Sequence, residues 1–225
     1  MPHPIPELRQ SSLAAYVSAG VLLVAGSATL ALVERSALSE LMGQHLLVMN
    51  VVAPVLGAAM ARLPLKLASN PRPLGGAALA QMLLLWGWHA PLVQQAAGGS
   101  LGLHLLMLGL LAAAAILFWA TTLRAAAEER WSAIAALLIT GKLACLLGGL
   151  MIFAPRELYG LAGLAFSICT AGPSTLADQQ LAGLMMIVAC PLSYIVAGLI
   201  MTMQMLARLE LRSARRTGAL AGAIS

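Results

Sequence analysis

The chain has 225 residues, of which 60% are hydrophobic and only 9% are charged, and its formal net charge is +5. A soluble domain carries roughly a quarter charged residues, so this composition excludes an ordinary soluble protein and predicts an integral membrane protein. The three cysteines form no C-x-x-C pair, and the sequence therefore gives no reason to expect a thiolate cluster or a disulfide.

Six apolar segments are long enough to cross a bilayer, for which an α-helix needs about 20 mostly apolar residues. The first is longer than the 7–15-residue apolar region of a signal peptide, and we expect it to be a retained helix. We therefore predict an all-α fold: a polytopic transmembrane helix bundle forming a single integral membrane domain over residues 1–225. The predicted spans are 13–33, 38–60, 74–97, 101–123, 131–153 and 180–207.

The connections differ in character. Proline-rich or charged segments such as "ARLPLKLASNPRP" and "RAAAEER" cannot continue a membrane helix. The last connection contains an apolar stretch, Leu158 to Thr170, that is too short to span. We expect this stretch to lie in the membrane interface or to fold back into the protein.

The distribution of lysine and arginine predicts the orientation. With both termini in the cytoplasm, ten basic residues fall on the inside and two on the outside, a clear positive-inside bias. The net positive charge is then mainly a topology signal, with the lipid bilayer as the partner and no nucleic acid implied. The inside residues are Arg9, Arg62, Lys66, Arg72, Arg124, Arg130, Arg208, Arg212, Arg215 and Arg216, and the outside residues are Arg35 and Arg156.

This topology gathers polar residues in one layer near the outer face. His45, His89 and His104 lie in the outer parts of the second, third and fourth spans, and Asp178, the only aspartate of the chain, opens the sixth. Ionisable residues inside membranes are expensive and often functional. We therefore expect the acid to face the histidine layer, with Gln179 and Gln180 beside it to orient it.

The spacing around the histidines places methionines on the same helix faces and so indicates which metal the site would bind. Residues three or four apart share a helix face, so His45 shares a face with Met42 and Met49, and His104 shares one with Met107. Imidazole with thioether is a ligand set suited to copper, particularly Cu(I).

Structural readings of the same residues stay open. A histidine can simply bridge two helices, the methionines can be packing residues, and Asp178 can be a helix cap. Glu40 fits a solvated helix start.

Several stretches resemble one family when taken together. They are "LSELMGQHLLVMNVVAPVL", "WHAPLVQQA" followed by "LHLLMLGLLAAAAILFW", "IFAPRELYG" and "LADQQLAGLMM". In this order they resemble the CtaG-type cytochrome c oxidase assembly factors, membrane proteins linked to copper delivery. The resemblance implies roles for His45, His89, His104 and Asp178. Related sequences often carry a second histidine where this chain has Leu108, which bears on the number of metal ligands.

The resulting functional hypothesis is a non-enzymatic assembly factor of the bacterial inner membrane that holds or delivers copper near the outer face. The metal ligands would be His45, His89 and His104, with Met42, Met49 and Met107 as further candidates. Its partners would be haem–copper oxidase subunits and, as a donor, a periplasmic copper chaperone. Two alternatives remain: a redox protein with a b-type haem held by two of the histidines, and a transporter with a proton or metal pathway.

Overall fold

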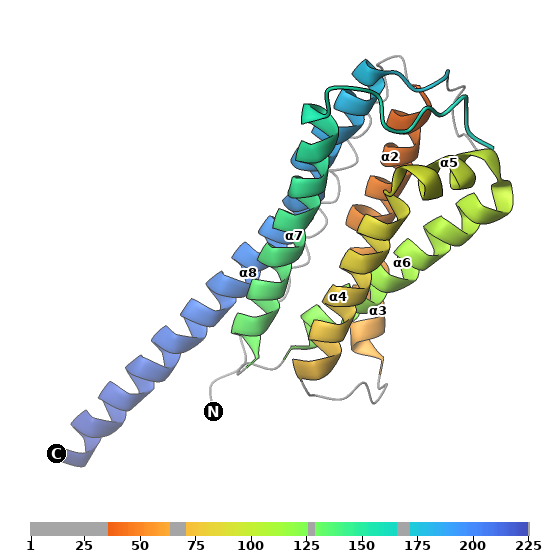
Figure 1. Ribbon diagram of the computed structural model, residues 1–225. Helices are drawn as coiled ribbons and strands as arrows, with labels where there is room; N and C mark the ends of the chain where they lie inside the picture. Colours follow the sequence, from red (N-terminus) through yellow and green to blue (C-terminus); the bar gives the residue numbers. More distant parts are fainter. Residues whose placement is uncertain (1–35, 64–70, 126–128, 166–171, 225) are drawn as a thin grey trace.

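The computed structural model describes residues 36–63, 71–125, 129–165 and 172–224, and every regular element in these ranges is a helix (Figure 1). In chain order they are α2 (Ala37–Leu47), the π-helix η1 (Val48–Val52), α3 (Ala53–Arg62), α4 (Pro71–Trp88), α5 (Pro91–Gly99), α6 (Leu101–Arg124), α7 (Arg130–Phe153) and α8 (Leu176–Ile224).

Four helical segments are long and apolar enough to cross a membrane, whereas we predicted six spans. They are Ala37–Arg62, Leu101–Arg124, Arg130–Phe153 and Leu176–Ser213. The predicted span 13–33 lies outside the described residues. Six spans are therefore not confirmed, but the described residues are all-helical and include four candidate membrane-spanning helices.

The predicted span 74–97 is wrong as a single helix. The chain breaks after Trp88, and α5 starts afresh at Pro91 with Ala90 in an extended conformation. Proline disfavours the helical conformation of the residue before it, and it is well tolerated in the first turn of a helix. The break leaves His89 between two helices.

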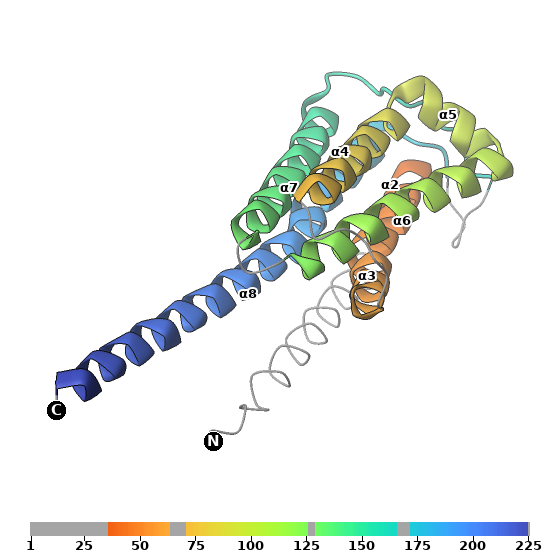
Figure 2. The same cartoon turned by 90° about the horizontal axis from the view of Figure 1, so that it is seen from below.

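The helices form a bundle in which α7 and α8 lie side by side (Figures 1 and 2). They approach closely at Gly148 and Gly183, where a Cβ atom added to either glycine would come within 2.8 Å or less of the other's carbonyl oxygen. Small residues allow membrane helices to approach in this way. We call the end of the bundle that carries α5 the α5 end.

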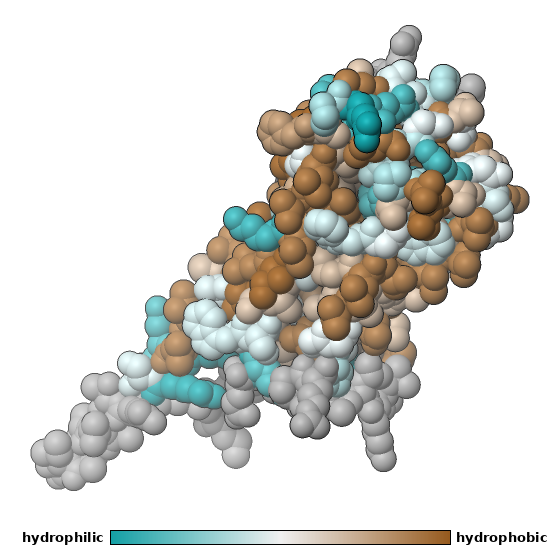
Figure 3. All heavy atoms as spheres, in the orientation of Figure 1, coloured by the Kyte–Doolittle hydropathy of each residue, from teal (hydrophilic) through white to brown (hydrophobic). Residues whose placement is uncertain are grey.

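The outside of the bundle suits a lipid environment. Apolar side chains cover most of the visible face between the two ends, and the polar surface gathers towards those ends (Figure 3). Large apolar residues with exposed side chains occur on every membrane-length segment, among them Val55, Leu105, Leu150 and Leu199. A soluble protein would not expose so extensive an apolar surface.

The segment 154–165 has no helix and folds back over the α5 end. Tyr159 and Leu161 are buried there, and the Ala165 N–H donates to the Gly98 carbonyl at 2.8 Å. The described part of the stretch that begins at Leu158 therefore folds back onto the protein, one of the two outcomes we expected. Residues 166–171 lie outside the described ranges.

Helix α8 contains Pro191, which has no N–H to donate to the Ile187 carbonyl one turn earlier. The Cys145 thiol of α7 donates to this carbonyl instead, with a sulfur–oxygen distance of 3.8 Å. Gly141, one turn before Cys145, packs against Pro191. The neighbouring helix thus compensates the interruption in α8.

Candidate functional site

His45 and His89 form the centre of the candidate site. His45 projects from α2 and His89 from the break after α4, and both side chains are almost fully buried. Their ring centroids are 5.5 Å apart at an interplanar angle of 66°, an edge-to-face contact. Two segments more than forty residues apart in the chain thus bring two imidazoles together inside the bundle.

The hydrogen bonds of His89 fix its tautomer. Its Nδ1 lies 2.7 Å from the Leu85 carbonyl oxygen, and a carbonyl can only accept, so Nδ1 carries the proton. In a neutral ring the lone pair is then on Nε2. This Nε2 is buried and has no hydrogen-bond partner within the described part of the chain. A backbone bond on one nitrogen and a lone pair on the other is a common arrangement for a metal-binding histidine.

His45 is unusual because both of its ring nitrogens are buried without a hydrogen-bond partner among the described residues. Leaving a buried polar atom unsatisfied costs about 1–3 kcal/mol. A purely structural histidine would be expected to bond to a neighbouring helix. His45 and His89 together therefore present three ring nitrogens that the described protein groups do not satisfy.

His104 joins this region through a chain of polar side chains on α2. The Gln44 amide nitrogen donates to Glu40 at 3.3 Å, and the Gln44 amide oxygen lies 2.8 Å from His104 Nε2. With the Gln44 amide nitrogen directed at Glu40, its oxygen faces His104, whose Nε2 is then the donor. Glu40 is 1% exposed, so our expectation of a solvated helix start is wrong.

The structure does not gather the three histidines into one first coordination sphere. His45 and His89 touch, whereas His104 contacts Gln44, the residue next to His45. Among the described residues, no group of three or more His, Cys, Asp and Glu side chains is arranged to hold a metal ion. The geometry offers a pair of imidazoles, with a third histidine, His104 of α6, bonded to the residue of α2 that precedes His45.

The carboxylate of Asp178 does not face a histidine, contrary to our prediction. Its two oxygens accept the backbone N–H groups of Leu38 at 2.9 Å and Ser39 at 3.1 Å. These belong to the first turn of α2, whose N–H groups have no partner within the helix. The Ala37 N–H donates to the Gly172 carbonyl. Asp178 is therefore a cap, but of a helix whose donor groups lie 140 and 139 residues earlier in the chain.

The two glutamines after Asp178 do not orient it. Gln179 accepts the Leu158 N–H at 2.8 Å and donates to the Met151 carbonyl at 3.0 Å. Gln180 donates to the Ile152 carbonyl at 3.4 Å. Both side chains fasten the end of α7 and the following loop to α8.

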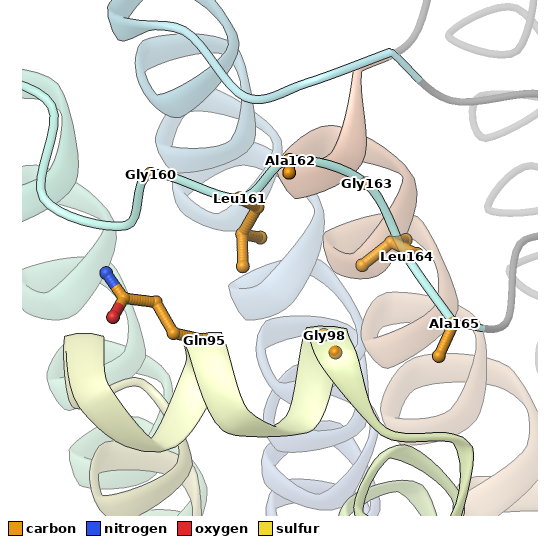
Figure 4. A pocket seen from close by; sticks show the side chains of 9 residues that line it. Gln95, Gly98, Gly160, Leu161, Ala162, Gly163, Leu164 and Ala165 are labelled. Carbon is orange, nitrogen blue, oxygen red and sulfur yellow. The ribbon is translucent and has the colours of Figure 1, made fainter.

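The segment 154–165 closes this end of the site. The Tyr159 hydroxyl donates to the His89 carbonyl at 3.2 Å, and Gln95 of α5 donates to the Tyr159 carbonyl at 2.6 Å. Burial raises the pKa of the Tyr159 phenol to about 12. Between α5 and this loop lies an open pocket of about 450 Å³, lined by Gln95, Gly98, Gly99 and residues 160–165 (Figure 4).

Comparison with known proteins decides the family. Residues 8–208 match the model of the cytochrome c oxidase caa3 assembly factor. The chain belongs to this family. No curated protein and no solved structure matched the chain.

In this member of the caa3 assembly factor family, the methionines that we proposed as further ligands are all buried. Met42, Met49 and Met107 are at most 2% exposed, as expected both of packing residues and of ligands to a buried ion. Their role as ligands stays a prediction.

Sequence reasoning missed three buried polar residues of this assembly factor. Glu40 and Gln44 link α2 to His104, and Gln94 of α5 is fully buried with both amide atoms unpartnered within the described ranges. A signal was present for Glu40 and Gln44, which precede His45 by five and one residues within an otherwise apolar helix. No such signal was present for Gln94, because this residue falls inside the predicted continuous span 74–97.

Proposed function

We propose that this assembly factor holds a copper ion at the His45–His89 pair and passes it to the copper sites of the oxidase. The observation that carries the proposal is the edge contact between two buried imidazoles with three ring nitrogens unsatisfied by the described protein groups. The copper is cargo, and no bond chemistry is required of the protein.

The donor set supports copper over harder ions. Imidazole nitrogen suits copper, and thioether sulfur selects Cu(I) in particular, whereas magnesium and calcium require oxygen ligands. His89 supplies Nε2, fixed by its bond to Leu85, and His45 can supply either nitrogen. A site with few fixed ligands also suits a protein that must release its ion.

The ten-to-two distribution of basic residues supports an orientation with the α5 end outside the inner membrane. Copper would then arrive from a periplasmic donor and leave towards oxidase subunits on the same side. The haem alternative has less support, because a haem ligated by His45 and His89 would have to lie between rings that touch.

The test is a Cu(I) titration of the purified full-length protein against a chromophoric chelator under reducing conditions. The wild type should retain copper, and a His45→Ala, His89→Ala double variant should lose at least tenfold in affinity. The matched control is Thr140→Ala. Thr140 is also a buried polar residue but lies on α7, outside the histidine pair, so this variant should bind copper as the wild type does. Equal affinity in the wild type and the double variant would exclude the pair as the copper site.

The same preparations separate the alternatives. A Soret band that the double variant lacks would indicate haem. Copper uptake into vesicles without any oxidase would indicate transport. In cells, the double variant at normal protein levels should lower the copper content of the oxidase.

A further inference from the structure

A second group of buried polar side chains lies deeper in the bundle, beyond the histidine pair. Asn50, in the π-helix η1, accepts a hydrogen bond from the Ser193 hydroxyl at 2.6 Å, and Gln81 of α4 donates to the Tyr194 hydroxyl at 2.6 Å. Ser193 and Tyr194 are consecutive residues of α8. One turn of α8 thus joins polar groups from η1 and α4.

The group continues onto α6. The Trp119 ring stacks on the Tyr194 ring with centroids 5.4 Å apart, and Thr122 follows Trp119 by one helical turn, on the same face. Trp119, Thr122 and Tyr194 are all at most 2% exposed. We call the six residues Asn50, Gln81, Trp119, Thr122, Ser193 and Tyr194 the inner polar cluster.

Four side-chain atoms of the inner polar cluster are buried without a hydrogen-bond partner in the described part of the protein. They are Asn50 Nδ2, Gln81 Oε1, Trp119 Nε1 and Thr122 Oγ1. The Asn50 amide is within hydrogen-bonding reach of the Cys190 thiol, but sulfur is a weak acceptor, so this contact satisfies the amide nitrogen only in part. Each unsatisfied group costs about 1–3 kcal/mol, and the hydrocarbon around a membrane bundle offers no alternative partner.

The four unsatisfied atoms include both hydrogen-bond donors and hydrogen-bond acceptors. Asn50 Nδ2 and Trp119 Nε1 can only donate, Gln81 Oε1 can only accept, and the Thr122 hydroxyl can do both. A ligand for this set must both accept and donate, and it must be neutral, because the cluster contains no charged side chain. A buried water molecule does this, typically with about three hydrogen bonds to groups that lack protein partners.

We propose that the inner polar cluster is a binding site for ordered water in the middle of the bundle. The π-helix contributes by presenting Asn50 towards α8: it is a wider turn of the kind that often occurs at functional sites. The inference is independent of copper, since it uses neither histidine of the pair.

Hydroxyl-radical labelling by X-ray radiolysis tests this proposal, because it modifies buried side chains that lie next to bound water. The sample is the full-length protein in detergent, analysed by mass spectrometry. Trp119 and Tyr194 should be modified although they are buried. An Asn50→Leu, Gln81→Leu double variant should reduce their modification several-fold, and Thr140→Ala should leave it unchanged. Unmodified Trp119 and Tyr194 in the wild type, or equal modification in the double variant, would overturn the proposal.

A gentler variant keeps the test decisive if the double variant fails to fold. Thr122→Val preserves the shape of the side chain and removes the hydroxyl. In a hydrated cluster it removes a hydrogen bond and should lower the midpoint of thermal unfolding by a few degrees. In a dry cluster it removes an unsatisfied group, so an unchanged or raised midpoint would count against bound water.

Discussion

The start of α8 and the histidine pair use polar side chains in opposite ways. At the start of α8, Asp178 and Gln179 bond to backbone groups of α2, α7 and the connecting loop. Deeper in the bundle, His45 has both ring nitrogens unpartnered among the described residues. A polar side chain whose hydrogen bonds are all made to protein groups stabilises the fold. One that is left without hydrogen-bond partners lowers the stability but can still bind a ligand. The distinction predicts opposite effects of mutation in the two regions.

The largest effect should come from Asp178→Ala. It leaves the buried N–H groups of Leu38 and Ser39 without acceptors, at about 1–3 kcal/mol each. We expect the free energy of unfolding to fall by about 3 kcal/mol or more. Asp178→Asn retains one acceptor oxygen and should lose about half as much. Denaturant unfolding in detergent measures both, and a wild-type stability for Asp178→Ala would show that the cap is not structural.

Tyr159 should make stability depend on alkaline pH. Its pKa is raised from about 10 to about 12 by burial, so between these values the unfolded state loses the phenolic proton while the folded state keeps it. Stability should therefore be intact below pH 10 and fall by about 2–3 kcal/mol as the pH rises through 12. Unfolding curves from pH 9 to 12 check this. Tyr159→Phe should lack this part of the decline, and an identical pH profile would refute the assignment.

His45→Leu should act in the reverse direction to the changes at Asp178. Replacing an unsatisfied buried ring by an apolar side chain removes an energetic cost, so we expect a gain of about 1 kcal/mol in the absence of metal. Copper affinity should fall at the same time. A marked loss of stability without metal would mean that His45 is a structural residue, and the contrast with Asp178 would fail.

The smallest expected effect is at Cys145. Its thiol bonds to the Ile187 carbonyl that Pro191 leaves without a donor, and a sulfur–oxygen hydrogen bond is weak. Cys145→Ala should cost about 0.5 kcal/mol. Cys145→Ser, which keeps a donor, should stay close to the wild type in the same unfolding assay.

The sequence predicted long helices well and their interruptions poorly. The spans 38–60, 101–123 and 131–153 agree closely with Ala37–Arg62, Leu101–Arg124 and Arg130–Phe153, because predominantly apolar runs of this length have few alternatives in a membrane. The break at Pro91 was missed, since apolar residues continue on both sides of it.

The sequence could predict that the polar residues of the site lie at a similar depth in the bundle, but not which of them contact one another. Helix direction and charge bias were enough to bring His45 and His89 to the same depth. They could not show that Asp178 would cap α2, because its partners lie about 140 residues away in the chain. Nor could they show that Glu40 is buried, because an acid in the first turn of a helix is more often solvated.

The cap between Asp178 and α2 has a consequence for the order of synthesis. A ribosome completes α2, α4, α6 and α7 before it reaches Asp178, so the first turn of α2 lacks the Asp178 acceptors until about 140 further residues have been synthesised. Contacts between such distant residues form slowly, and incompletely packed intermediates are the species most exposed to misassembly. Helix α2, which carries His45, therefore acquires its bonds to Asp178 only when the start of α8 has been made.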